Sequence, residues 1–305
     1  MGVPRRAVRQ ILLGLIPLVV IAVVSLILLA LRLGEARAPL RTATETATAE
    51  VVSTGLGADG RQVGVEYTDV DGELQTARLT LDRAADIPLG AQLDEVAYDP
   101  ERPGVVYVQG DAVTSTVADL FNGLLIVALV LLVTVVVTIL RLGGRRRLAA
   151  REPRQLRAHR EKYRRGIADR SWLVVQSGES RSWVPVYWDP ALEEIGESPT
   201  LVTVYGDPEG DKLLGFEVAG EPIWPSGRRR SAPPKGRERD LEATTGGVSL
   251  LRQTRTDLVG VFAAPLIGIL WAYIDGSGPA GFVFATAVAA GVLFWLPSAY
   301  GSDPT

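Results

Sequence analysis

The chain has 305 residues and a formal net charge of −3; 47% of its residues are hydrophobic, and its mean hydropathy is +0.18. It contains no cysteine and a single histidine, His159. This excludes disulfides, thiolate nucleophiles and cysteine-based metal sites, and leaves one position around which a Ser–His–Asp triad could be built. Arginine greatly outnumbers lysine, and together with abundant Ala, Gly and Val this composition is typical of a bacterium with a GC-rich genome.

Four apolar stretches predict transmembrane helices, because about 20 helical residues cross a hydrocarbon core of roughly 30 Å. They cover residues 11–33, 118–140, 257–274 and 279–297. A cleaved signal peptide is the alternative for the first stretch, but its apolar part is longer than the ~7–15 residues usual in such peptides, and Pro39 would follow the cut. Trp271 and Trp295 lie near helix ends, as in an aromatic interface belt. Gly276-Ser277-Gly278 predicts a tight turn between the last two helices.

The basic residues that flank these stretches predict the topology. Arg5, Arg6 and Arg9 precede the first helix, twelve basic residues lie within residues 141–170, and another basic group precedes the third helix. Basic flanks stay in the cytosol, so we expect residues 1–10, 141–256 and 298–305 inside and residues 42–116 outside. The sequence therefore predicts a multi-pass protein of a bacterial cytoplasmic membrane, with cytoplasmic N- and C-termini.

Residues 42–116, the predicted extracytoplasmic module, follow a β pattern. Apolar and polar residues alternate over residues 62–67 and 74–81, and Asp71-Gly72 between them is a hairpin signal. About five short strands predict a small antiparallel barrel or sandwich, and fourteen acidic residues against four basic ones predict a negative surface. Asp69-Val70-Asp71-Gly72 resembles the start of a calcium loop, but Thr80 stands where the last glutamate ligand would be. A solvated turn is therefore favoured, and no metal site is predicted.

This module resembles a known family. The resemblance rests on Val63–Gly72, on Leu89-Gly90 and on Val96-Ala97-Tyr98-Asp99-Pro100, followed by Pro103. Over residues 1–140 the sequence is similar to actinobacterial-type membrane proteins of the family catalogued as domain of unknown function 3592. The resemblance implies a β-module between two transmembrane helices and singles out the turn Tyr98, Asp99 and Pro100. The family has no established activity, so the resemblance implies no catalytic residue.

Residues 141–170 are predicted to form a basic juxtamembrane linker, interrupted by Pro153, in which residues 156–165 could form a short helix. Such a charge density predicts contact with anionic lipid headgroups, although the arginines could also serve only to fix the topology. Nucleic-acid binding is not predicted, because no aromatic or fold signature accompanies the charge. His159 is expected to be a solvated side chain. The residues expected to contact lipid are Arg145, Arg146, Arg147, Arg151, Arg154, Arg157, Arg160, Arg164 and Arg165.

Residues 171–226 are predicted to form a second, cytoplasmic β-module, followed by a flexible basic linker over residues 227–256. At least two of its four tryptophans are expected to fill its core, the alternative being an exposed aromatic surface for a partner. Val96–Glu101 and Val204–Glu209 share four of six residues. Either the two modules are a duplication, or two hairpins use the same Asp-Pro turn for local reasons.

The fold class expected is membrane α + β: four transmembrane helices with two small antiparallel β-rich barrel or sandwich modules. No charged residue marks an ion or proton path through the membrane centre, and no phosphate loop, nucleophile elbow or metal-ligand spacing occurs. We predict a noncatalytic accessory or interaction protein without a cofactor, which presents its modules on both sides of the membrane to an unidentified protein partner. The alternatives are a membrane sensor, an accessory subunit of a transporter or channel, and an enzyme that uses carboxylates of either module.

Overall fold

The computed structural model describes residues 2–84, 87–166, 168–241 and 248–305. The chain divides into two compact units, one formed by residues 24–129 and the other by the residues before and after this segment. Each unit has its own β-sheet and its own hydrophobic core.

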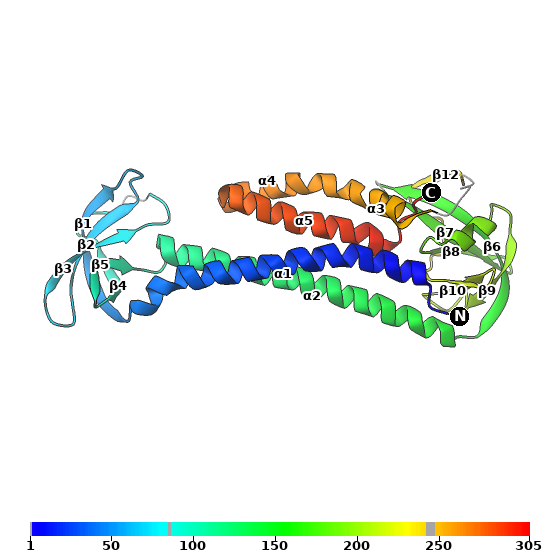
Figure 1. Ribbon diagram of the computed structural model, residues 1–305, viewed down its shortest axis with the longest axis horizontal. Helices are drawn as coiled ribbons and strands as arrows, with labels where there is room; N and C mark the ends of the chain where they lie inside the picture. The colour runs from blue at the N-terminus through cyan, green and yellow to red at the C-terminus, as the bar shows by residue number, and fades with distance from the viewer. Residues whose placement is uncertain (1, 85–86, 167, 242–247) are drawn as a thin grey trace. The chain divides into compact units, whose positions relative to one another are not determined.

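Four helical segments in the described part of the chain are long and apolar enough to cross a membrane. They are α1 (Arg5–Thr42), α2 (Ala112–Arg146) with the short η1 (Arg147–Ala150), α3 (Leu250–Leu258) continued through η3 (Val259–Ala263) into α4 (Ala264–Asp275), and α5 (Gly278–Tyr300) (Figure 1). All four expected stretches are therefore helical. All four helical segments begin before the predicted bounds and end beyond them, because good helix formers such as Arg, Ala and Leu flank the apolar residues.

Residues 45–107 form a closed five-stranded barrel. Its strands are β1 (Glu45–Leu56), β2 (Gln62–Thr68), β3 (Leu74–Thr80), β4 (Gln92–Asp99) and β5 (Arg102–Tyr107), in the order β1-β2-β3-β5-β4, with β1 also paired to β4. All pairings are antiparallel except β3 with β5, which is parallel. This order is that of an OB-fold, a five-stranded Greek-key barrel. The prediction of a small β-barrel is confirmed, although the barrel is not wholly antiparallel.

The barrel closes around alternate residues of its strands. Val65 and Val96 are fully buried, and the rings of Tyr67 and Tyr98 lie 4.7 Å apart between their centroids. The Tyr67 hydroxyl donates to Pro103 O at 2.9 Å, and burial raises the pKa of Tyr67 to about 12. The two tyrosine rings thus fill the barrel core together with the alternating aliphatic residues, and both hydroxyls hydrogen-bond to backbone groups.

The second sheet lies in the other unit. Its strands are β6 (Pro153–Arg165), β7 (Ala168–Ser177), β8 (Ser180–Pro185), β9 (Thr200–Tyr205), β10 (Gly215–Val218), β11 (Glu221–Ile223) and β12 (Arg237–Arg239). The strand order is β11-β10-β9-β6-β7-β8, and β12 pairs with β6. Trp188, Phe216 and Leu192 of the short helix η2 (Pro190–Glu194) are buried in its core. We call residues 153–239 the β-module.

Three predicted boundaries near this module are wrong. Residues 153–165, expected to be linker or helix, form its central strand β6, and the module reaches residue 239 instead of ending at 226. The predicted flexible linker 227–256 contains β12 and most of α3, while its residues 242–247 lie outside the described part of the chain. The strand was missed because its inward-facing positions include Arg160 and Lys162, so β6 shows no apolar alternation.

Glycines bring α5 close to its neighbours. A β-carbon at Gly14 of α1 would lie 2.5 Å from Cβ of Ser298, and one at Gly291 would lie 2.9 Å from Leu18. Gly291 of α5 therefore faces α1, and Ala285 of α5 is buried. Close approach of helix backbones at small residues is a common way to pack helices in membranes.

We expect Gly14→Ala to destabilise the helix packing by about 1–3 kcal/mol, because the added methyl group overlaps Ser298. Gly143→Ala is the matched control: Gly143 is a helical glycine of α2 with no atom within 4 Å of an added β-carbon. This control should be neutral or should stabilise by about 0.4–1 kcal/mol. Thermal unfolding of both variants in detergent measures the difference. Equal shifts of the two variants would contradict the close α1–α5 contact.

Candidate functional site

The β-module is seated on the ends of the first two helices. Tyr187 and Trp224 of the module are each 1% exposed and form one cluster with Ala7 and Ile11 of α1, against which Leu142 of α2 also packs. The Tyr187 hydroxyl donates to Ala299 O of α5 at 2.7 Å. Helices from both ends of the chain therefore contribute to the same apolar joint.

Arginines near this joint stack on aromatic rings of the β-module and of α5. The Arg6 guanidinium lies 4.1 Å from the centroid of the Trp188 ring, and that of Arg141 lies 4.2 Å from the Tyr300 ring. Arg145 is buried; it donates to Pro225 O and lies over the Tyr187 ring. Arg6 and Arg145 thus join the module to α1 and α2, whereas Arg141 joins α2 to α5.

Residues 301–305, which we call the tail, are mostly buried and bond to both the helices and the β-module. Gly301 begins the tail with a φ of 73°, and a β-carbon there would collide with Ser226. Ser302 is 1% exposed; it accepts hydrogen bonds from Gln10 of α1 and Gln253 of α3 and donates to Asp257. The predicted cytoplasmic end 298–305 is thus a buried structural element.

Asp303 of the tail meets Arg160 of β6 in a buried ion pair. Nη2 of Arg160 lies 3.1 Å from Oδ2 of Asp303, with side-chain exposures of 3% and 0%. Nη1 of Arg160 lies 2.9 Å from Glu193, and Ser171 Oγ donates to Asp303 at 2.5 Å. Asp303 N–H also donates to Asp169 O at 2.8 Å. Every charged group in this network has an opposite charge or a hydrogen-bond partner, as a buried ion requires.

The structure separates the arginines expected to contact lipid into three groups. Arg145 and Arg160 are buried. Three others pair with aspartates of the module: Arg151 with Asp211 at 2.9 Å, Arg154 with Asp207 at 3.2 Å and Arg164 with Asp169 at 2.8 Å. The side chains of Arg146, Arg147 and Arg157 are exposed and have no hydrogen-bond or ion-pair partner among the described residues, and the side chain of Arg165 lies outside the described part of the chain.

Four arginines not included in that expectation complete a group at the helix ends. Arg5 and Arg9 of α1 and Arg252 and Arg255 of α3 are exposed, and like Arg146 and Arg147 of α2 their side chains have no hydrogen-bond or ion-pair partner among the described residues. All six lie at the end of the helices that carries the β-module (Figure 1); we call them the basic rim. The sequence could have identified these four arginines, because they belong to the basic flanks from which the topology was predicted.

His159 is not solvated as predicted, because its side chain is only 14% exposed. Its Nε2 lies 3.0 Å from Oε1 of Glu161, while its buried Nδ1 has no partner in the described residues. Glu161 also accepts from Tyr163 Oη and Trp183 Nε1, each at 2.9 Å. No serine hydroxyl among the described residues hydrogen-bonds to this histidine, so the arrangement is not a triad.

The family-motif turn has a structural role in the barrel. Tyr98 is buried, and its hydroxyl accepts from Val70 N at 3.0 Å. Asp99 Oδ1 accepts from Glu101 N at 2.9 Å, which fixes the turn through Pro100. In the neighbouring hairpin Asp69 accepts from Asp71 N, Glu73 N and Gln75 Nε2, so backbone and amide donors lower the pKa of this carboxyl. The Asp69 carboxylate is thus used within its turn.

We expect Arg160→Gln to destabilise the protein by about 3–5 kcal/mol, because Asp303 and Glu193 would lose their buried cation. The control is Arg154→Gln, which removes a half-exposed ion pair and should cost less than about 1 kcal/mol. Thermal unfolding in detergent gives both values. Limited proteolysis should cut the tail sooner in the Arg160 variant alone; an equally protected tail would show that this ion pair does not hold it.

Comparison with known proteins gave no match: no family model, no curated protein and no solved structure matches this chain significantly. The resemblance of residues 1–140 to the family of unknown function therefore remains a prediction.

Proposed function

We propose that this protein is a noncatalytic membrane-anchored interaction protein. It presents the acidic barrel outside the cytoplasmic membrane and the β-module in the cytosol, each to a protein partner. In this arrangement the four apolar helices cross the membrane, and residues 1–10 and 298–305 lie on the cytosolic side.

The observation that carries this proposal is the seat of the β-module on the helix ends. The cluster of Tyr187, Trp224, Ala7 and Ile11 buries the contact surface, and the Arg160–Asp303 pair fastens it to the tail that follows α5. A soluble domain on a flexible tether would need neither contact. A module fixed in this way keeps one face at a set position relative to the helices, which suits the docking of another membrane-associated protein.

The charges support the proposed sides. The basic rim belongs at the cytosolic face by the positive-inside rule, and the barrel between α1 and α2 carries fourteen acidic residues within residues 42–116. Surfaces of opposite sign select different partners, because electrostatic complementarity guides encounter and excludes like-charged surfaces.

The topology can be tested directly, since the chain has no native cysteine. We expect a cysteine at Asp71, in the β2–β3 hairpin, to react with a membrane-impermeant maleimide in intact cells. A cysteine at Ser198, in the exposed segment before β9, should react only after the membrane is permeabilised. The unsubstituted chain is the control. Labelling of Ser198→Cys in intact cells together with protection of Asp71→Cys would invert the proposal.

The interaction itself is tested with a photo-crosslinking amino acid at exposed apolar positions of each module. Leu74 of the barrel is 70% exposed and Leu201 of β9 is 69% exposed. We expect each to give a discrete protein adduct in native membranes, identified by mass spectrometry. Leu132 of α2, which is 60% exposed within a predicted membrane span, is the control and should give lipid adducts. If both module positions give only the background of Leu132, the interaction proposal fails.

A further inference from the structure

A basic segment crosses the outer face of the β-module. At one end the backbones of Arg230 and Trp183 of β8 exchange two hydrogen bonds of 2.8 and 2.9 Å. At the other end β12 pairs with Lys162–Arg164 of β6. Because β7 lies between β6 and β8 in the sheet, residues 231–236 must pass across β7. We call residues 229–236 the strap.

The strap is fixed by its own sequence. Pro233 and Pro234 stiffen its centre, because each proline ring restricts φ. A β-carbon at Gly236 would lie 2.6 Å from Arg164 O, so only glycine permits this approach to β6. The sequence predicted a flexible linker here. The segment is instead held at both ends, by Trp183 of β8 and by the pairing of β12 with β6.

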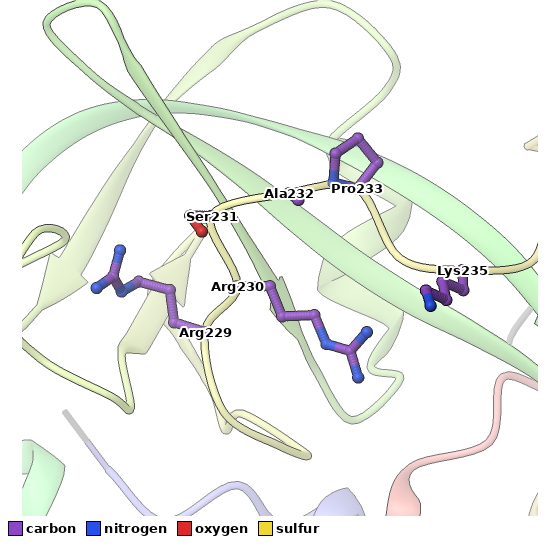
Figure 2. Close-up of a pocket in the computed structure, with 6 residues that line it drawn as sticks. All are labelled: Arg229, Arg230, Ser231, Ala232, Pro233 and Lys235. Carbon is purple, nitrogen blue, oxygen red and sulfur yellow. The ribbon is translucent and has the colours of Figure 1, made fainter.

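The strap borders a cavity of about 420 Å³ that is largely open to solvent. Its lining residues come from the strap alone and include no acidic side chain (Figure 2). They are Arg229, Arg230, Ser231, Ala232, Pro233 and Lys235.

The side chains of two of its three cations have no hydrogen-bond or ion-pair partner among the described residues. Arg229 donates to Asp211 O, Glu209 O and Ser182 Oγ, so its guanidinium is used within the module. These two cations are the side chains of Arg230 and Lys235. Figure 2 shows their charged ends on the same side of the strap, while Arg229 points away from them.

The Arg230 side chain stacks on the ring of Trp172. Its guanidinium lies 5.4 Å from the centroid of the Trp172 ring, which is 4% exposed. A cation stacked on a buried aromatic ring loses less conformational freedom when it binds a ligand than a free surface arginine does. Lys235 adds a compact ammonium, which binds phosphate as a point charge.

A second cavity of about 260 Å³ is also lined by cations, but its lining includes acidic residues as well. There Arg164 pairs with Asp169, Lys162 donates to Thr305 O, and Asp240 is a further lining residue. Two of the three basic residues of that cavity's wall are thus used within the chain, and the cavity includes two aspartates, whereas the strap cavity includes no acidic residue.

We propose that the strap cavity binds the phosphate group of a phosphorylated ligand, held by the guanidinium of Arg230 and the ammonium of Lys235. A guanidinium can bind two phosphate oxygens side by side, and the lysine can reach a third. A soluble phosphate ester and the terminal phosphate of a lipid offer the same chemistry, and the experiment separates these two sources.

The test compares Arg230→Gln/Lys235→Gln with the control Arg228→Gln/Lys212→Gln. The control removes the same charge from exposed residues that do not line the cavity. In one arm, calorimetry of the full chain in detergent measures binding of pyrophosphate and glycerol 3-phosphate. In the other arm, nanodiscs with and without phosphatidic acid are compared by Trp fluorescence, because Trp172 lies beneath Arg230.

We expect the cavity variant to bind at least about tenfold more weakly than the wild type, since it loses two charge-assisted contacts. The control should keep wild-type affinity. A selective loss in the soluble arm supports a phosphorylated metabolite, and a selective loss in the nanodisc arm supports a lipid phosphate. Absence of binding by the wild type in both arms, or equal weakening in the two variants, would overturn the proposal. Unchanged thermal unfolding of the cavity variant shows that a loss is not caused by misfolding.

Discussion

The buried contact between Arg160 and Asp303 is the interaction on which the unit of helices and β-module depends. It joins the central strand of the sheet to the tail that follows α5, two segments 143 residues apart in sequence. Neither ion would be stable alone at this depth, since an unpaired buried charge costs several kcal/mol. The pair therefore forms only when β6, β7 and the tail are all in place. Folding of the module and seating of α5 are thereby linked.

The barrel and the β-module treat the edges of their β-sheets in different ways. In the barrel, pairing of β1 with both β2 and β4 closes the sheet and leaves no free edge, so solubility rests on its acidic surface. In the β-module, β8 and β6 are instead bridged by the strap. The different strand orders do not support duplication of the modules. The shared Asp-Pro turns have a local cause: Asp99 and Asp207 each accept a hydrogen bond from the backbone N–H two residues later.

The apolar residues made most of the architecture predictable. Uninterrupted apolar stretches indicated the helices, and alternation over residues 62–67 and 74–81 indicated barrel strands, because in both cases burial follows hydrophobicity. Trp172, Trp188 and Trp224 are buried, which confirms the prediction that at least two tryptophans fill the core. The burial of polar and charged side chains could not be predicted. Arg160, Ser302 and Asp303 resemble surface residues in sequence, and only partners distant in the chain make their burial favourable. The same reason hid β6 and the strap within segments expected to be linkers.

Strand β7 contacts both the tail and the strap, the two features that could not be predicted from the sequence. Ser171 faces the tail and bonds Asp303, whereas Trp172, the next residue, lies beneath Arg230 on the opposite face, as alternation along a strand requires. Proximity of this kind does not amount to allosteric coupling, which needs an element with two states. The anchored strap, the buried ion pair and the apolar joint all favour a single arrangement of the module on the helices. A ligand in the strap cavity would then act mainly by changing the charge and shape of a fixed surface.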